Sequence, residues 1–280
     1  MFKRSELYFK KILFFSCAIL ISCNNRAVTP EKTTATSRST LKARASVSPE
    51  ITVKKEVPVL CYHHIRNWRK RDTKRDHNDI ISPLRFENHL KMLADSGYHS
   101  ILPDELCRYL DSGYRLPEKP IMISFDDGYR EQFTIAAPLL TKYGFKAVFF
   151  VTTDAIGGRR MLKKKQIRLL SDEGHIIANH TFQHKNLTRL TDSSLRTQIF
   201  ESAKKLQQIT GKEIEYLAYP YGIYNDSLGA RLKNFGIKAA FILSTKRSNK
   251  YPLYTIRRII DPGTYTSKNL YHSINKSFNK

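Results

Sequence analysis

The chain has 280 residues and a formal net charge of +23, with 48 Lys and Arg against 25 Asp and Glu. A charge of this size favours polyanions such as nucleic acid, anionic lipid or acidic wall polymers, although it also serves plain solubility. Because no RNA-binding signature or zinc-finger spacing accompanies the charge, nucleic acid is not expected as a partner.

The N-terminus has the pattern of a bacterial export signal. Residues 1–22 begin with basic residues and continue into an apolar stretch that is too short to span a bilayer comfortably. The sequence Leu20-Ile21-Ser22-Cys23 resembles a lipobox, in which the Cys becomes the lipidated first residue of the mature chain. We therefore expect an exported protein anchored to the membrane of the cell envelope through Cys23. Asn24 after this Cys favours an outer membrane, if the cell has one.

Residues 23–55 are rich in Thr, Ser, Ala, Lys and Arg and hold almost no large apolar side chains. Such a stretch cannot bury enough surface to fold, so we expect a flexible polar tether. Residues 56–280 are enough for one large domain with its own core, which we expect to act as a monomer. Cys61 lies in an apolar run and is expected to be buried; spacing alone does not show whether it pairs with Cys107.

Apolar runs and helical patterns alternate along this domain. In chain order we expect a strand at Val57–Tyr62, a helix from the N-cap Ser82 to Gly97, a strand at Tyr98–Leu102, a helix at Pro103–Leu110, a strand at Ile121–Phe125, a helix at Glu131–Lys142, a strand at Ala147–Thr152, a helix at Lys163–Asp172, a strand at His175–Ala178, a helix at Asp192–Thr210 with Asp192 as its N-cap, a strand at Tyr216–Tyr219, a helix at Asp226–Phe235, and strands at Ala239–Leu243 and Tyr254–Ile259. Most strands are continuous apolar runs, which is typical of a parallel sheet covered by helices. About seven such units favour a barrel, in which functional groups gather at the carboxyl ends of the strands.

One predicted strand ends in two adjacent carboxylates. The stretch IMISFDDGYR, residues 121–130, runs from an apolar strand directly into Asp126 and Asp127. Buried carboxylates are costly unless they are paired or bound to metal. Since neighbouring side chains along a strand point in opposite directions, the two acids are expected to have different roles.

Two other strand ends carry candidate site residues. His180 and His184 follow the predicted strand at His175–Ala178, and at a spacing of four they can face the same way on one helical turn. Two imidazoles and one carboxylate are the usual protein ligands of an open catalytic zinc site. The stretch LAYPYGIYND contains Pro220 and Gly222, which favour a turn that can aim a backbone N–H into the site; taken alone, it is an ordinary loop.

Together these segments resemble the motifs of the polysaccharide deacetylase family, also called NodB-like or carbohydrate esterase family 4. The first motif is Ser124-Phe125-Asp126-Asp127-Gly128, the second is His180-Thr181-Phe182-Gln183-His184, and the third is Ala218-Tyr219-Pro220-Tyr221-Gly222. The resemblance extends from Val57 to Ile259. The opening VPVLCYHHI and the Ala-Tyr-Pro-Tyr-Gly form are similar to the branch that includes poly-β-1,6-N-acetylglucosamine deacetylases.

The resemblance implies a distorted (β/α)7 barrel that removes N-acetyl groups from an N-acetylglucosamine-containing polysaccharide at the cell envelope. It implies that Asp127, His180 and His184 bind a divalent metal, with Zn²⁺ expected and Co²⁺, Ni²⁺ or Fe²⁺ as alternatives. Asp126 would be the general base, and the backbone N–H of Tyr221 would bind the oxyanion.

Two departures from the family pattern leave alternatives open. Ala218 stands where the family commonly has an Arg that braces the base. The late Leu-x-x-His motif that supplies the general acid is not evident, and His272 lies in the tail without that context. In the branch resembled, His63 occupies the position of a His that points into the site, with His64 as the alternative; His63 could instead make a structural hydrogen bond. The departures keep a second hypothesis, a weakly active or inactive glycan-binding module of the same fold. A third, a metal phosphodiesterase, lacks any further phosphate-binding motif.

Overall fold

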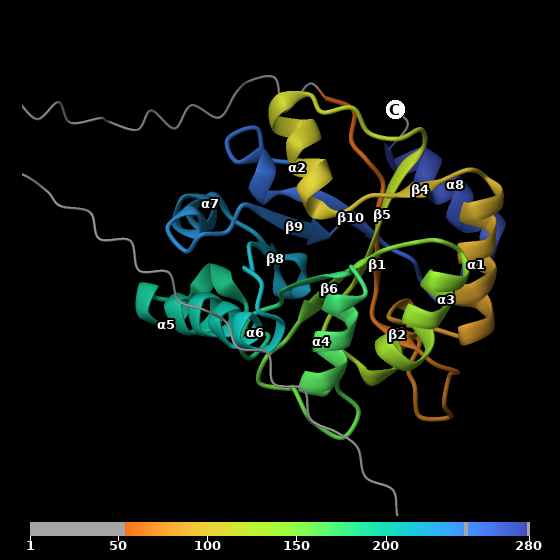
Figure 1. Cartoon of the computed structure of the whole chain (residues 1–280), viewed down its shortest axis with the longest axis horizontal. Coiled ribbons are helices and arrows are strands. Elements are labelled where there is room, and N and C mark those ends of the chain that lie inside the picture. Colours follow the sequence, from red (N-terminus) through yellow and green to blue (C-terminus); the bar gives the residue numbers. More distant parts are fainter. Residues whose placement is uncertain (1–53, 244–245, 279–280) are drawn as a thin grey trace, which may run out of the picture. The chain divides into compact units, whose positions relative to one another are not determined.

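The computed structural model describes residues 54–243 and 246–278 (Figure 1). The predicted signal, Cys23 and the tether up to residue 53 lie outside these ranges, so those expectations remain predictions. Within the described ranges, no helix is both long enough and apolar enough to cross a membrane.

Seven parallel strands form a closed barrel. Around the ring the order is β1, β10, β9, β8, β7, β6 and β5, and the pairing of β1 with β5 closes it. The strands are β1 Val59–Tyr62, β5 Pro120–Phe125, β6 Val148–Val151, β7 Ile176–Asn179, β8 Tyr216–Ala218, β9 Ala239–Leu243 and β10 Ile256–Ile260. This ring, with its helices, confirms the predicted (β/α)7 barrel.

The remaining strands are short and lie outside the ring. The expected strand at Tyr98–Leu102 is reduced to β4, His99–Ser100, which pairs with the amino end of β5 at Pro120 and Ile121. The pair β2, His64–Ile65, and β3, Ile80–Ile81, was not predicted, because two-residue strands leave no readable period. This pair brackets the charged loop at residues 66–79, so the loop leaves and re-enters the fold at one place.

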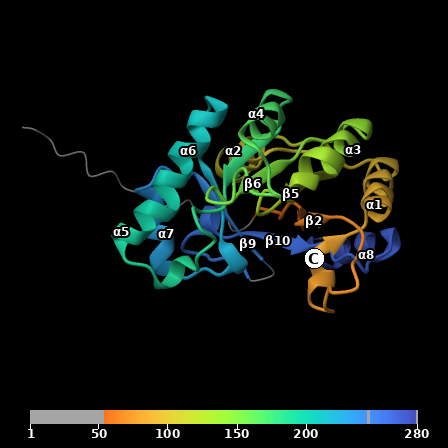
Figure 2. The same cartoon turned by 90° about the horizontal axis from the view of Figure 1, so that it is seen from below.

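Helices cover the outside of the barrel, with α1, α3 and α8 on one side and α5, α6 and α7 on the other (Figures 1 and 2). The helices are α1 Pro83–Asp95, α2 Pro103–Ser112, α3 Ala137–Lys142, α4 Lys164–Asp172, α5 Asp192–Arg196, α6 Ser202–Thr210, α7 Asp226–Lys233 and α8 Ser267–Phe278. Helix α8 was not predicted, although Leu270, Ile274 and Phe278 bury one face of it at a spacing of four.

The predicted long helix at Asp192–Thr210 is confirmed in extent but not in detail. A π-turn at Thr197–Glu201 separates α5 from α6, and a second π-turn, Gln132–Ala136, precedes α3. The N-cap is Thr191 rather than Asp192, because the Thr191 hydroxyl accepts a hydrogen bond from the Ser194 N–H at 3.3 Å. Asp192 is the first helical residue, where its charge still favours the positive end of the helix.

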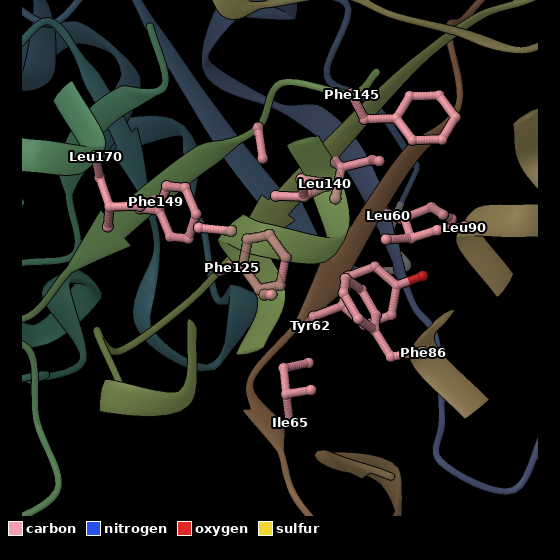
Figure 3. Packing of buried hydrophobic residues seen from close by; sticks show 14 of the residues in the cluster. Leu60, Tyr62, Ile65, Phe86, Leu90, Phe125, Leu140, Phe145, Phe149 and Leu170 are labelled. Atoms are coloured by element: carbon pink, nitrogen blue, oxygen red, sulfur yellow. The ribbon is translucent and has the colours of Figure 1, made fainter. Parts of the chain in front are cut away.

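Alternate residues of the strands divide the core into two layers. Phe125 and Phe149 point outward and stack at 4.9 Å, and Tyr62 meets Phe86 of α1 edge-on at 5.0 Å (Figure 3). The inward residues fill the barrel, and they are Val59, Met122, Val148, Phe150, Ala178, Tyr216, Ala218, Ala239, Phe241 and Ile256. This filling holds the strand ends in fixed positions, so the loops that follow them can form a precise site.

Candidate active site

The predicted site residues come together at the carboxyl ends of the barrel strands. His63 follows β1, the acid pair follows β5, His180 follows β7, and the turn that contains Tyr221 follows β8. Gln132 ties two of these ends together: its side-chain amide donates to the carbonyl of His63 at 3.0 Å and to that of Asp126 at 2.6 Å. The site is therefore built on strand ends that the core and this amide both fix.

Three side chains form a candidate metal centre. Asp127 Oδ1 lies 3.5 Å from Nε2 of both His180 and His184, and the three donor atoms lie within 4.8 Å of one another. Ligands that each sit 2.0–2.2 Å from one tetrahedral ion are about 3.3–3.6 Å apart, so this spacing fits a zinc-like ion. The fit is in the donor chemistry as well, since carboxylate and imidazole are both zinc ligands.

The hydrogen bonds around the two histidines suit ligation. The Nδ1–H of His180 donates to the carbonyl of Ala218 at 2.9 Å, which leaves the Nε2 lone pair directed at Asp127 when the ring is neutral. Burial, followed by the proximity of His180, lowers the pKa of His184, which favours its neutral form as well. Both imidazoles are thus poised to accept a cation.

The second motif does not form the helical turn that the spacing of four suggested. Thr181 and His184 have φ values of +70° and +56°, in the left-handed region, so the two imidazoles meet across an irregular turn. Asn179 braces this turn, because its side-chain oxygen accepts from the Thr181 N–H at 2.7 Å. Asp127 and Tyr221 also have positive φ, at +72° and +62°. Such strained backbone concentrates at functional sites.

Asp126 and Asp127 have different surroundings, as the strand pattern predicted. Asp126 is buried inside the barrel, where the guanidinium of Arg258 binds both its oxygens, at 2.6 and 2.8 Å. Burial alone would raise the pKa of Asp126, but Arg258 and then His180 outweigh it and hold this pKa well below its usual range. Asp126 therefore stays ionised, and its orientation is fixed.

Arg258 was missed by the sequence analysis. It lies within β10 and is fully buried, with its guanidinium 5.2 Å from the ring centre of Phe150. The signal was present: an Arg-Arg pair, Arg257 and Arg258, interrupts an otherwise apolar strand. A charged residue that points into a barrel needs a counter-charge. Asp126, a buried acid whose bracing residue was not identified, was the candidate partner for Arg258.

His63 lies beside the acid pair, whereas His64 turns away from it. Nε2 of His63 is 3.9 Å from Asp126 Oδ2, and its Nδ1 is buried without a hydrogen-bond partner among the described residues. His64 instead binds Glu131 at 2.7 Å and stacks on the ring of Tyr129 at 3.6 Å. The geometry thus favours His63 over its neighbour as a group that can reach a substrate.

The third motif forms a tight turn on the other side of the site. Tyr221 is 62% exposed, and its ring meets the ring of His184 edge-on at 4.6 Å. Gly222 follows with φ of +66°, and a Cβ at this position would lie only 2.5 Å from Cβ of Leu243. The turn therefore requires glycine, and this close packing against β9 sets the position of the Tyr221 backbone.

The remaining candidates lie apart from this constellation or contribute indirectly. His272 is on the exposed face of α8, which packs against α1. Cys61 and Cys107 are both free thiols, and Cys61 Sγ lies 3.5 Å from Asp126 Oδ2. Cys61, His63 and Asp126 are also close enough to hold an ion. However, burial raises the pKa of the Cys61 thiol and Arg258 already occupies the carboxylate, so this second group suits a cation poorly.

Comparison with known proteins identifies the family. The polysaccharide deacetylase model matches residues 113–253. The protein YxkH of Bacillus subtilis (strain 168) is 30% identical over 213 residues, which cover 74% of this chain and 72% of YxkH. The chain belongs to the polysaccharide deacetylase family. The resemblance drawn from the three motifs is therefore confirmed.

Two further relatives of this deacetylase-family chain are themselves named as deacetylases. The poly-beta-1,6-N-acetyl-D-glucosamine N-deacetylase of Staphylococcus aureus (strain MRSA252) is 28% identical over 192 residues, covering 62% of this chain and 66% of the relative. The solved structure of the Streptococcus pyogenes deacetylase PplD in complex with acetate superimposes with a TM-score of 0.70 at 25% identity. That match covers 78% of this chain and 98% of PplD. Family membership makes the chain a deacetylase-type hydrolase.

Proposed function

We propose that the chain is a metal-dependent N-deacetylase that hydrolyses N-acetyl groups of an N-acetylglucosamine-containing polysaccharide and releases acetate. The observation that carries the proposal is that the two adjacent acids, Asp126 and Asp127, have different partners. Asp127 faces two imidazoles at 3.5 Å, and Asp126 is held in one orientation by Arg258. The relative from Staphylococcus aureus, which acts on poly-beta-1,6-N-acetyl-D-glucosamine, supports this class of substrate.

The residues suit amide hydrolysis. Asp127, His180 and His184 would hold the metal, with Zn²⁺ as the expected ion. When bound, a divalent cation lowers the pKa of a water molecule and polarises a carbonyl. Asp126 accepts the proton of the attacking water, because its Oδ2 lies 3.8 Å from Nε2 of His180 and 3.9 Å from Nε2 of His63.

Two other groups of the site bind the oxyanion and protonate the leaving amine. The backbone N–H of Tyr221 donates a hydrogen bond to the developing oxyanion. His63 gives a proton to the amine that leaves, because its Nε2 lies 3.9 Å from Asp126 Oδ2, beside the acid pair. The balance is one water and one N-acetyl group consumed, and one acetate and one amine formed.

The case for an inactive glycan-binding module weakens once Asp126 is seen to be braced. That alternative drew its weight from Ala218 in place of the family Arg and from the unrecognised late His motif. Arg258 supplies two charge-assisted hydrogen bonds to the base, and His63 offers a proton donor beside it. The chain therefore retains a group for each role.

We also propose that the protein works outside the cytoplasm, anchored through lipidated Cys23. The support is the sequence alone: an export signal, a lipobox Cys and a polar tether precede the catalytic domain. An envelope polysaccharide would then lie within reach of the tether.

A panel of glycans assayed for acetate, with and without a chelator, tests the proposed activity. We expect acetate from β-1,6-linked or β-1,4-linked N-acetylglucosamine oligomers, loss of release after chelation, and recovery on addition of Zn²⁺. Glycan binding without acetate release from any oligomer, at full metal occupancy, would support the binding-module alternative instead.

A further inference from the structure

Two loops at the catalytic end of the barrel bring arginines from distant parts of the sequence together. We call Arg66, Arg69, Arg71, Arg159 and Arg160 the arginine cluster. The first three belong to the loop between β2 and β3, and the last two to the loop between β6 and α4. The mutual repulsion of the two groups is strong enough to lower the pKa of Arg160, with Arg69 as the largest cause.

The cluster lies at the rim of the candidate active site. Arg66 is three residues after His63, and its backbone N–H donates to the carbonyl of Ile81 at 2.9 Å. The second loop is fastened to the first motif: the Arg160 carbonyl accepts from the Arg130 N–H at 2.8 Å, and the Leu162 N–H donates to the Gly128 carbonyl at 2.8 Å. Both arginine-bearing loops are thus anchored beside Asp126 and Asp127.

The charge of the cluster is largely uncompensated. Arg66 is paired with Asp72 at 2.7 Å. The other four side chains are exposed, and none of them has a carboxylate within ion-pair distance in the part of the chain that the structure describes. Like charges gathered in this way raise the free energy of the unliganded protein, and a bound anion would relieve that repulsion.

An exposed aromatic ring lies within the same loop. Trp68 is 44% exposed, its indole N–H donates to the carbonyl of Ile80 at 3.1 Å, and its ring stacks on His77 at 4.0 Å. The indole is therefore held in one orientation, with apolar surface available to the C–H face of a sugar ring. Arginines on the same loop as such a ring suit a sugar chain that carries negative charge, rather than an isolated anion.

We propose that the arginine cluster and Trp68 bind an anionic glycan, so that the N-acetylglucosamine polymer presented to the active site carries carboxylate or phosphodiester groups on residues next to the one that reacts. The proposal rests on the proposed deacetylase activity and adds the class of polymer. Binding at the arginine cluster would also favour release of the product. Each new amine that takes up a proton adds positive charge to the glycan, and the cluster repels this charge.

Three defined probes separate the chemistries. Hyaluronan oligosaccharides alternate N-acetylglucosamine with a carboxylate sugar, poly(N-acetylglucosamine 1-phosphate) carries phosphodiesters, and chitohexaose is neutral. Binding is measured by fluorescence anisotropy of the labelled glycan, and acetate release is measured alongside it. We expect wild-type protein to bind one or both anionic probes about tenfold or more tightly than chitohexaose, with a preference that fades at high salt. The anionic probe that binds better identifies the charged group.

Paired variants test the residues. Arg69→Ala with Arg71→Ala, and separately Arg159→Ala with Arg160→Ala, should each weaken binding of the anionic probe about tenfold, through the loss of two exposed charge contacts, and leave chitohexaose within about twofold. The control is Arg108→Ala with Arg115→Ala, which removes the same charge from exposed arginines around the end of α2, before the amino end of β5. Trp68→Ala should weaken binding of all three glycans.

The outcomes separate this inference from the proposed function. Equal binding of neutral and anionic probes by wild-type protein would overturn the inference, as would an equal loss in the control pair or tighter binding of a single-stranded oligonucleotide than of either anionic glycan. Absence of acetate from every probe would count against the deacetylase proposal, while the binding preference would still decide what the cluster recognises.

Discussion

Replacing Arg258 with methionine would leave the Asp126 carboxylate buried in the barrel without its counter-charge. The guanidinium makes two charge-assisted hydrogen bonds to this carboxylate, and both side chains are almost fully buried. Removal of one partner from a buried ion pair costs about 3–5 kcal/mol. For a domain of this size, that corresponds to a fall in the melting temperature of about 10 °C.

The measurement is urea unfolding of the chelated protein, so that metal binding does not add to stability. Arg257→Met is the matched control, because Arg257 lies next to Arg258 but pairs with Glu56 at a partly exposed position. A partly exposed pair of this kind, near the surface, contributes about 0–1 kcal/mol. The double variant Asp126→Asn with Arg258→Met should be more stable than the sum of the two single losses predicts.

The pH dependence of activity provides a second test of the contact between Arg258 and Asp126. The pKa of Asp126 is depressed in the folded protein, so its contribution to stability is present above its ordinary pKa near 4 and is lost as pH falls through the lower folded value. Without Arg258 this pKa rises, and the acid limb of the pH–rate profile should move to higher pH. If Arg258→Met is as stable as Arg257→Met and its acid limb is unmoved, Arg258 does not hold the base.

Three further predictions concern single residues. Asp126→Asn should lower turnover about 10²–10⁴-fold with metal content unchanged by elemental analysis, because a neutral amide cannot accept the water proton; near-normal acetate release would remove Asp126 as the base. His63→Ala should lower kcat far more than metal affinity, whereas His64→Ala should change kcat little; equal effects would contradict the assignment. Cys23→Ser should shift the protein out of the membrane fraction, and unchanged fractionation without lipid mass on the wild-type N-terminus would argue against a lipid anchor.

The strands of the barrel and the candidate metal ligands could be predicted from the sequence because each depends on local pattern. The predicted strand Ala239–Leu243 is β9 without change, and the predicted strand Ile121–Phe125 differs from β5 by one residue. Buried parallel strands are continuous apolar runs, and the acids and imidazoles follow them directly. Short motifs of this kind can be recognised even when the bounds of the surrounding helices are predicted wrongly.

The geometry of the candidate metal ligands could not be predicted from their spacing. A separation of four between His180 and His184 fits a helical turn, but the chain uses left-handed residues that Asn179 braces from β7. This conformation depends on contacts with α6, where the Ser202 hydroxyl donates to the Asn179 side chain at 2.9 Å. Tertiary contacts of this kind override the local preference for a helical turn. They join residues that are distant in the sequence, so a short segment of sequence does not reveal them.

The contact between Arg258 and Asp126 is created by closure of the barrel, so no short segment of the sequence predicts it. Arg258 and Asp126 are 132 residues apart, and they meet only because β10 and β5 both pair with β1. The family pattern commonly places the brace of the base where Ala218 stands, on β8, two strands along the ring from β10. Inward positions near the carboxyl ends of β8 and β10 face the same interior, so a long guanidinium from either can reach the carboxylate at the end of β5. Ala218 then makes room inside the barrel, and its carbonyl remains to orient His180. The brace can therefore change strands while the acid it holds stays in place.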